Sequence, residues 1–177
     1  LETPLSVYLK LANGAFSYLL ESAAQGGEKW GRYSIVGLPS STVLQVSGNQ
    51  LTVTTDGEIV ERVDTDDPLS FIEKYQAGFR VPLVEGLPRF YGGLVGYFGY
   101  DTVRYVERRL RSSIPPDPIG TPDILLMVSN DVAVYDNVSS RLQLISLADP
   151  TAPHAYERAI ENLHALAGKL DSPLPPI

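Results

Sequence analysis

A carboxylate, a hydroxyl and a guanidinium lie close together near the start of the chain. Glu21 and Ser22 follow two leucines at the end of a short apolar run, and Arg32 opens the next apolar run after a glycine pair. An α-amino acid needs oxygen acceptors for its ammonium group, and a guanidinium, hydroxyl or backbone N–H groups for its carboxylate. It also needs an apolar slot for its side chain. These residue types could therefore bind an α-amino acid.

The same three residues have a simpler interpretation, which the residue types alone favour. Glu21 would be a solvated side chain at a strand end, Ser22 would start a turn, and Arg32 would be a surface cation. Few interactions would suffice for binding, because each charge-assisted hydrogen bond contributes about 1.5–3 kcal/mol. Two such bonds and a buried indole would reach micromolar affinity, which corresponds to about −8 kcal/mol.

Length and composition limit what the chain can be. It has 177 residues, of which 44% are hydrophobic and 20% charged, with a net charge of −7. This is enough for a sizeable core. The acidic balance argues against a nucleic-acid partner. The arginine cluster beside Glu107, which comprises Arg108, Arg109 and Arg111, is expected to be a solvated face.

The absence of cysteine excludes disulfides and thiolate metal sites. No apolar run is long enough to span a membrane.

The sequence offers no convincing catalytic or metal site. His154 and His164 lie on one predicted helix without a partner at ligand spacing. Asp64, Asp66 and Asp67 precede a helix start, where acidic side chains complement the helix dipole and cap free N–H groups. The nucleophile-elbow, zinc-protease and phosphate-loop motifs are absent. We therefore predict no catalytic residue and no metal ligand in this chain.

Apolar alternation and turn signals predict many short strands. A two-residue hairpin is indicated at Asp56-Gly57, and the first third of the chain is expected to be an antiparallel meander. The predicted strands are Ser6–Ala12, Ser17–Glu21, Tyr33–Leu38, Thr42–Ser47, Gln50–Thr55, Glu58–Arg62, Ile124–Val128, Val132–Tyr135 and Leu142–Ser146.

Two helices are marked by caps or by apolar spacing. Asp67 and Pro68 begin one that Gly78 ends, and an amphipathic helix runs from about Pro153 to Leu170. Between them, the segment Gly92–Glu107 reads as a glycine-rich strand followed by a short helix. We expect that strand to be central and tightly packed. The residues expected to line its contact or cap its helix are Tyr91, Tyr97, Phe98, Tyr100 and Asp101.

Together these elements indicate an α+β fold, rich in antiparallel strands, with two or three helices. We expect residues 1–170 to form one domain and residues 171–177 to be a proline-rich linker. Since the chain starts at Leu1 and ends in prolines, we further expect it to be one domain of a longer polypeptide.

Three segments carry a resemblance to a known family. They are Leu19-Leu20-Glu21-Ser22, the stretch Gly31–Gly37, and Gly92–Tyr97 followed by Tyr100-Asp101. In these segments the chain resembles the N-terminal domain of anthranilate synthase component I, over nearly its whole length. The LLES motif is fairly specific within that family. The GG-x-x-GY…YD signature is shared with para-aminobenzoate synthase component I.

The resemblance implies a domain that binds L-tryptophan for allosteric feedback inhibition. The whole enzyme converts chorismate and glutamine to anthranilate in tryptophan biosynthesis. Catalysis belongs to a C-terminal chorismate-binding domain that uses Mg²⁺, which the N-terminal domain does not bind. The implied protein partners are that C-terminal domain and a glutamine amidotransferase subunit, component II. The implied location is the cytoplasm, and this chain alone is expected to be inactive.

The resemblance also implies which residues contact tryptophan. Glu21 and Ser22 of the motif contact the inhibitor, with Leu20 beside them. From their position and chemistry we extend the site to Arg32, Tyr33 and Ser34, with Lys29 as a competing cation.

Two other interpretations stay open. One is para-aminobenzoate synthase component I, which makes aminodeoxychorismate and holds tryptophan as a structural ligand. The other is a β-rich interaction module without enzymatic function, which would show no stabilisation by tryptophan.

Overall fold

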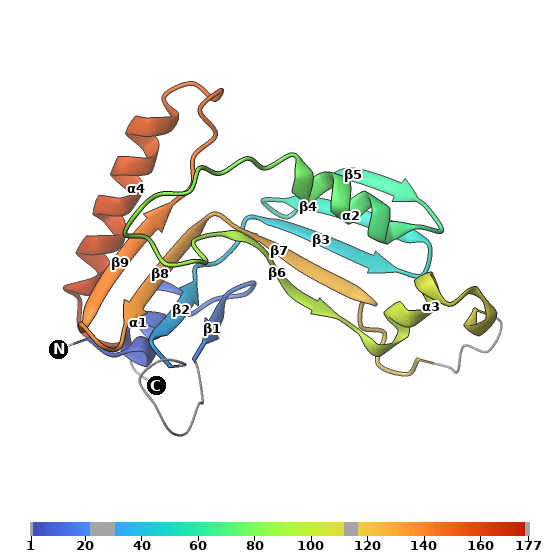
Figure 1. The fold of residues 1–177 in the computed structure, drawn as a ribbon, viewed down its shortest axis with the longest axis horizontal. Coiled ribbons are helices and arrows are strands. Elements are labelled where there is room, and N and C mark those ends of the chain that lie inside the picture. Colours follow the sequence, from blue (N-terminus) through green and yellow to red (C-terminus); the bar gives the residue numbers. More distant parts are fainter. Residues whose placement is uncertain (1, 22–30, 112–116, 176–177) are drawn as a thin grey trace. The chain divides into compact units, whose positions relative to one another are not determined.

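The structure, a computed structural model, describes residues 2–21, 31–111 and 117–175. These residues form two β-sheets and four α-helices in an antiparallel α+β arrangement (Figure 1). The predicted fold class is confirmed, with four α-helices in place of the two or three expected. The chain packs as two compact units. The first unit comprises Leu1–Ser40, Glu85–Gly93 and Ser129–Ile177, and the second unit comprises Ser41–Val84 and Leu94–Val128.

The first unit contains β1 (Tyr18–Leu20), β2 (Tyr33–Gly37), β8 (Asp131–Asp136), β9 (Arg141–Ser146), α1 (Pro4–Leu11) and α4 (Ala155–Leu170). Its sheet has the order β1-β2-β8-β9, with antiparallel neighbours. Helix α1 contacts β2 and α4, and α4 contacts β9. The apolar residues buried among these elements, which we call the first core, are Val7, Leu11, Ala12, Val36, Leu38, Ala133 and Leu166. Helix α4 ends at Leu170, while the separation of a domain over 1–170 from a linker over 171–177 stays a prediction.

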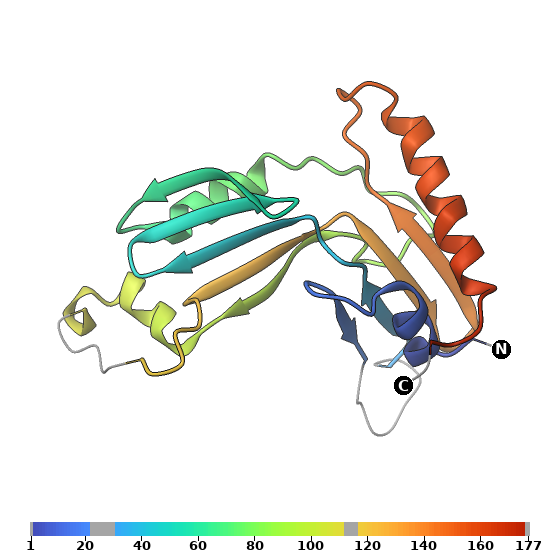
Figure 2. The same cartoon turned by 180° about the vertical axis from the view of Figure 1, so that it is seen from behind.

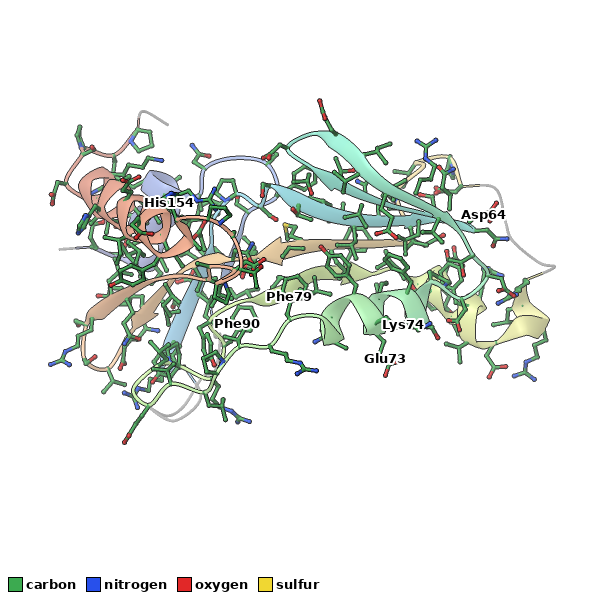
Figure 3. All side chains as sticks on the ribbon, turned by 90° about the horizontal axis from the view of Figure 1, so that it is seen from above. Asp64, Glu73, Lys74, Phe79, Phe90 and His154 are labelled. Atoms are coloured by element: carbon green, nitrogen blue, oxygen red, sulfur yellow. The ribbon has the colours of Figure 1, made fainter. Side chains whose placement is uncertain are left out.

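The second unit is built on a five-stranded sheet covered by one helix. Its elements are β3 (Thr42–Ser47), β4 (Gln50–Thr55), β5 (Glu58–Asp64), α2 (Pro68–Ala77), β6 (Gly93–Phe98), α3 (Val103–Val106) and β7 (Ile124–Ser129). The strand order is β5-β4-β3-β7-β6, and α2 lies behind these strands in Figure 2. Ile72 of α2 is buried against the sheet, whereas Glu73 and Lys74 are exposed and point away from it (Figure 3).

The N-terminal segment is a helix, so the predicted strand over Ser6–Ala12 is wrong. Thr3 and Ser6 form a capping box, in which each side chain accepts a hydrogen bond from the other residue's backbone N–H. Val7 and Leu11 lie one turn apart and are both buried in the first core. The cap and this buried face outweigh the apparent alternation of apolar and polar residues.

The other strand predictions are confirmed to within two residues at each end. Asp56 and Gly57 form the predicted turn, with φ angles of 51° and 83°. The predicted meander is wrong as a whole, because β2 pairs with β1 and β8 whereas β3 pairs with β4 and β7. Only β3, β4 and β5 form a meander. A partner strand about a hundred residues away leaves no local signal in the sequence.

Both helices predicted from caps and apolar spacing are confirmed. Asp67 accepts a hydrogen bond from the backbone N–H of Ser70 at 3.1 Å, and Gly78 stands at the C-cap of α2. Helix α4 begins at Ala155, so His154 precedes the helix in a left-handed conformation, with φ of 55°, instead of lying within it. His164 is on an exposed position of α4.

Strand β6 lies at the edge of its sheet, next to β7, so its predicted central position is wrong. The predicted close approach is confirmed, because a Cβ added to Gly96 would lie 1.9 Å from the carbonyl oxygen of Leu125. Glycine is required here by the neighbouring backbone.

The aromatic residues around β6 do not line this contact. Tyr97, Phe98 and Tyr100 are 41%, 54% and 93% exposed, and Tyr91 is half-buried. Asp101 does not cap the helix that follows, since its carboxylate pairs with Nε of Arg104 at 2.7 Å.

We predict that Gly96→Ala destabilises the chain by about 1–3 kcal/mol, because the added Cβ must displace the backbone of Leu125. Gly168 in α4 has nothing within 4 Å of an added Cβ. Gly168→Ala is therefore the matched control and should stabilise its helix by up to about 1 kcal/mol. Urea denaturation followed by circular dichroism measures both. Equal stability of wild type and Gly96→Ala would contradict the close approach.

Candidate functional site

Those predicted site residues that the structure describes lie where β1 ends and β2 begins. Leu20 pairs with Ile35 across the two strands and is 50% exposed. Glu21 follows directly and is exposed, and Arg32 directly precedes β2. Ser22 and Lys29 lie outside the described residues. The structure thus brings Leu20 and Arg32 to the same end of one strand pair.

Strand β1 has only three residues, and Tyr18 anchors it. Its ring lies over Gly37, where an added Cβ would come within 1.9 Å of the ring, and its hydroxyl lies 2.7 Å from Oγ of Ser129. Ser129 is buried, and partial burial raises the pKa of Tyr18 above its usual value. The position of Leu20 and Glu21 therefore depends on a glycine in β2 and a serine at the end of β7.

Arg32 is fixed by a carboxylate from the opposite strand. Its Nε and Nη2 donate hydrogen bonds to Oδ2 of Asp136 at 3.1 and 2.8 Å. The guanidinium carbon lies 5.0 Å from the ring centroid of Tyr33, within cation–π distance. The Arg32 side chain is nevertheless 52% exposed, and its Nη1 takes no part in these two bonds. Asp136 thus holds the Nε–Nη2 edge of the guanidinium, while about half of the side chain remains exposed.

Asp136 was not predicted as a site residue, yet it organises this region. Its Oδ1 accepts hydrogen bonds from the backbone N–H groups of Val138 and Ser139 at 3.0 and 3.3 Å. The residue is only 8% exposed. The Arg32 guanidinium first, and the turn N–H groups after it, hold the pKa of Asp136 well below its usual range, although burial opposes them. Asp136 in turn raises the pKa of Arg32.

Asn137 is the second residue that the sequence did not single out. Its Nδ2 donates to the carbonyl of Gly31 at 2.9 Å and to Oγ of Ser34 at 3.2 Å, and its backbone N–H donates to the carbonyl of Arg32 at 2.7 Å. Ser34 is only 2% exposed, so its hydroxyl is used inside the fold. The turn between β8 and β9 thus holds the start of β2. The only sequence signal was an Asp-Asn pair typical of turns.

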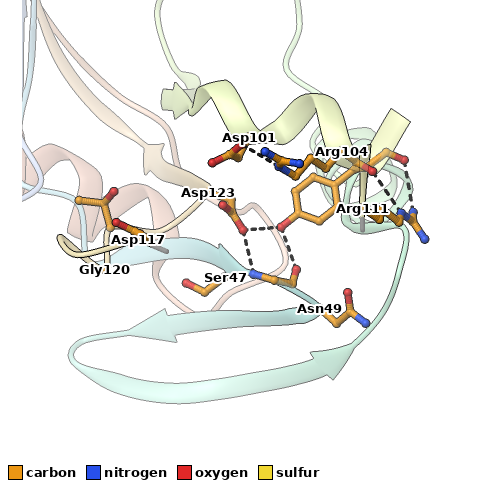
Figure 4. A pocket seen from close by; sticks show the side chains of 11 residues that line it. Ser47, Asn49, Asp101, Arg104, Arg111, Asp117, Gly120 and Asp123 are labelled. Atoms are coloured by element: carbon orange, nitrogen blue, oxygen red, sulfur yellow. Dashed lines mark hydrogen bonds and ion pairs between the residues drawn. The ribbon is translucent and has the colours of Figure 1, made fainter. Parts of the chain in front are cut away.

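A separate cavity of about 550 Å³ lies in the second unit (Figure 4). The Tyr105 hydroxyl lies 2.6 Å from Oδ2 of Asp123 and 2.8 Å from the carbonyl of Gly48, whose N–H donates to the same Oδ2 at 2.8 Å. Burial, and then Asp123, raise the pKa of Tyr105 far above its usual value. These bonds tie the loop after β3 to α3 and to the start of β7, which is a structural role.

The arginine cluster is only in part the solvated face that was expected. Arg109 is 82% exposed and pairs with Glu107 at 3.3 Å. Arg111, in contrast, donates to the carbonyls of Arg104 and Asp66 at 3.1 and 3.0 Å. It therefore fastens the segment after α3 to the start of α2.

Among residues 2–21, 31–111 and 117–175, no group of three or more His, Asp or Glu side chains is placed to hold a metal ion. In the same part of the chain, no helix is both long and apolar enough to cross a membrane.

Comparisons with known proteins give the family. No family model matches the chain. The chain is 57% identical over 175 residues to anthranilate synthase component 1 of Pseudomonas aeruginosa, which covers 99% of this chain and 35% of that protein. It is 43% identical over 166 residues to anthranilate synthase component 1 of Aquifex aeolicus, over 89% of this chain and 32% of that protein. The crystal structure of anthranilate synthase component I from Streptococcus pneumoniae TIGR4 matches 98% of this chain and 36% of its own, with 26% identity and a TM-score of 0.64.

The fold is therefore that of a part of a larger component I protein, an antiparallel α+β region. The chain spans about a third of the length of the curated relatives it matches. With identities of 57% and 54% along 99% of its length, it belongs to the anthranilate synthase component I family, of which it represents the N-terminal part. The resemblance drawn from the motifs is thereby confirmed.

We predict that Asp136→Asn lowers the thermal midpoint at neutral pH, because Arg32 and the turn N–H groups lose a carboxylate. The pKa of Asp136 is depressed in the folded chain, so its contribution is fully present above the unfolded pKa of about 4 and is lost progressively as pH falls from there through the lower folded pKa. The difference between the midpoints of variant and wild type should therefore begin to shrink below about pH 4.

Thermal melts between neutral pH and about pH 3 measure this convergence. The control is Asp171→Asn, an exposed aspartate just after α4, whose midpoint should follow wild type throughout. A difference between Asp136→Asn and wild type that stays constant down to low pH would contradict the assigned pair.

Proposed function

We propose that this chain is the regulatory N-terminal domain of an anthranilate synthase component I. In this proposal it binds L-tryptophan and thereby inhibits the conversion of chorismate and glutamine to anthranilate. The observation that carries the proposal is the match of nearly the whole chain to proteins named anthranilate synthase component 1. Catalysis, Mg²⁺ and the contact with the glutamine amidotransferase subunit are assigned to the full-length enzyme, so the chain alone is inactive.

The geometry at the end of β1 supports an α-amino acid as the ligand. The exposed Glu21 carboxylate offers acceptors for an ammonium group, and the outward edge of Arg32 offers N–H donors for a carboxylate. The half-exposed Leu20 and the ring of Tyr33 supply apolar surface for a side chain. Ser22 belongs to the proposed site through the LLES motif, and Lys29 remains the alternative cation.

Asp136 changes what Arg32 can contribute. Since the guanidinium is already paired with Asp136, a ligand carboxylate would add to an existing ion pair and not meet a lone cation. The planar guanidinium has five N–H groups, and two of them are used by Asp136. Arg32 is thus held rigidly in place for a second carboxylate, at reduced net charge. Ser34 contributes by fixing β2 through Asn137 instead of touching the ligand.

Inhibition would follow from a shift between two states of the whole enzyme. Tryptophan would bind the arrangement of the domains that is not competent for chorismate more tightly than the competent one. The shift cannot exceed the difference between the two tryptophan affinities.

The first experiment uses the full-length protein that contains this chain. It is given chorismate, Mg²⁺ and ammonia, and anthranilate fluorescence is followed with and without L-tryptophan. Anthranilate formation that tryptophan suppresses is the expected result. Formation of aminodeoxychorismate would move the protein to the para-aminobenzoate branch and make tryptophan a structural ligand. Anthranilate formation that tryptophan leaves unchanged would overturn the regulatory role.

We predict that Glu21→Gln in the full-length enzyme raises the tryptophan concentration for half-inhibition by about 10- to 150-fold. This is the loss of one charge-assisted hydrogen bond. Each variant is compared with its own uninhibited rate. The matched control is Glu73→Gln, an exposed glutamate on α2 (Figure 3), which should leave the inhibition curve in place. An unshifted curve for Glu21→Gln would exclude Glu21 as the ammonium partner.

We also predict that Ser22→Phe abolishes inhibition, because the bulky side chain would fill the slot assigned to tryptophan. Inhibition curves and equilibrium dialysis with labelled tryptophan on the full-length enzyme measure it. A variant that remains fully sensitive to tryptophan would show that the slot lies elsewhere.

A further inference from the structure

Helix α1 joins the end of β1 to the end of α4. Leu19, the residue before Leu20, packs against the first core, and so does Leu170, the last residue of α4. Val7 and Leu11 of α1 belong to that core, and α1 contacts both β1 and α4 (Figure 1). One packed group of side chains therefore touches both β1, at whose end the candidate site lies, and the last residue of α4.

Lys10 fixes the C-terminal end of α4. Its Nζ donates to the carbonyl of Leu170 at 2.6 Å and to Oε1 of Glu2 at 2.6 Å. The Lys10 side chain is only 9% exposed, so these two acceptors offset the cost of removing its ammonium group from water. The cation also meets the negative end of the α4 dipole. Ser6 supports the arrangement, since its hydroxyl donates to Oε2 of Glu2 at 2.6 Å.

Loss of this contact would be costly, because a largely buried ammonium group that loses one of its two acceptors is left partly unpaired. Coupling between two sites needs an element with two discrete arrangements, beyond mere proximity. The coupling proposed below requires the Lys10–Leu170 contact to be made in one arrangement and broken in the other.

We propose that Lys10 is a positioning residue for feedback inhibition: α1 transmits tryptophan binding at the end of β1 to the end of α4 through the first core and the Lys10–Leu170 contact. The inference rests on the proposed function, in which the segment after Leu170 leads into the catalytic part. Lys10 does not touch the ligand in this scheme. Its loss should uncouple inhibition from binding.

The test uses full-length enzyme and measures two quantities separately. Equilibrium dialysis with labelled L-tryptophan gives the dissociation constant, and the increase in the KM for chorismate at saturating tryptophan gives the coupling. For Lys10→Met we expect a tryptophan dissociation constant within about threefold of wild type, and a coupling factor reduced at least about tenfold or to unity.

Two further variants separate coupling from folding. Lys10→Arg keeps a cation that can reach both acceptors and should restore inhibition. Lys169→Met removes an exposed lysine from the same last turn of α4 and should behave as wild type. Circular dichroism melts confirm that each variant is folded. If Lys10→Met does not fold, Lys10→Gln, which keeps a neutral donor for the Leu170 carbonyl, is compared with Lys10→Arg instead and should lose coupling in the same way.

The possible failures are distinct. Unchanged coupling in a folded Lys10→Met variant overturns the role of Lys10, as does a loss of tryptophan binding that matches the loss of inhibition. Wild-type enzyme that binds no tryptophan overturns the proposed function itself, and the inference with it.

Discussion

The first unit depends on one apolar cluster that gathers residues from both ends of the chain. Val7 and Leu11 come from α1, Val36 from β2 and Leu166 from α4, and all are at most 6% exposed. Helix α1 has only eight residues and strand β1 only three, so neither is expected to be stable without the elements it packs against. The short strand β1 packs against this cluster through Leu19, and so shares it with the distant helix α4.

This dependence explains which features the sequence could predict. The cap at Asp67 and the turn at Asp56-Gly57 are set by residues within a few positions, and both were predicted correctly. The segment Ser6–Ala12 was misjudged, because its strand-like alternation was read without the capping box at Thr3. The pairing of β2 with β8 could not be predicted, since only the folded core brings the two strands together.

The residues of the candidate site divide in the same way, into those that the local sequence reveals and those that only the fold brings close. Glu21 and Arg32 stand out by residue type and spacing, whereas Asp136 lies 104 residues after Arg32 and looks like an ordinary turn residue. Without Asp136, Arg32 would be judged a free cation, and its attraction for a ligand carboxylate would be overestimated. The pair instead makes Arg32 a rigid donor of low net charge. In the proposed site, such a donor would select a ligand carboxylate by geometry more than by long-range attraction.

A short edge strand is a suitable place for a regulatory ligand. Regions with few buried contacts open at lower free energy than the core, and a ligand can bias only an equilibrium that is already close to balance. Strand β1 is held by Tyr18 over Gly37 and by Leu19 on the first core, so a ligand at its last residue acts on both contacts. Because Leu170 packs against the same core, the proposed coupling from β1 to the end of α4 would not have to cross the sheet. The N-terminal helix, which touches both, is the element whose position such a ligand would set.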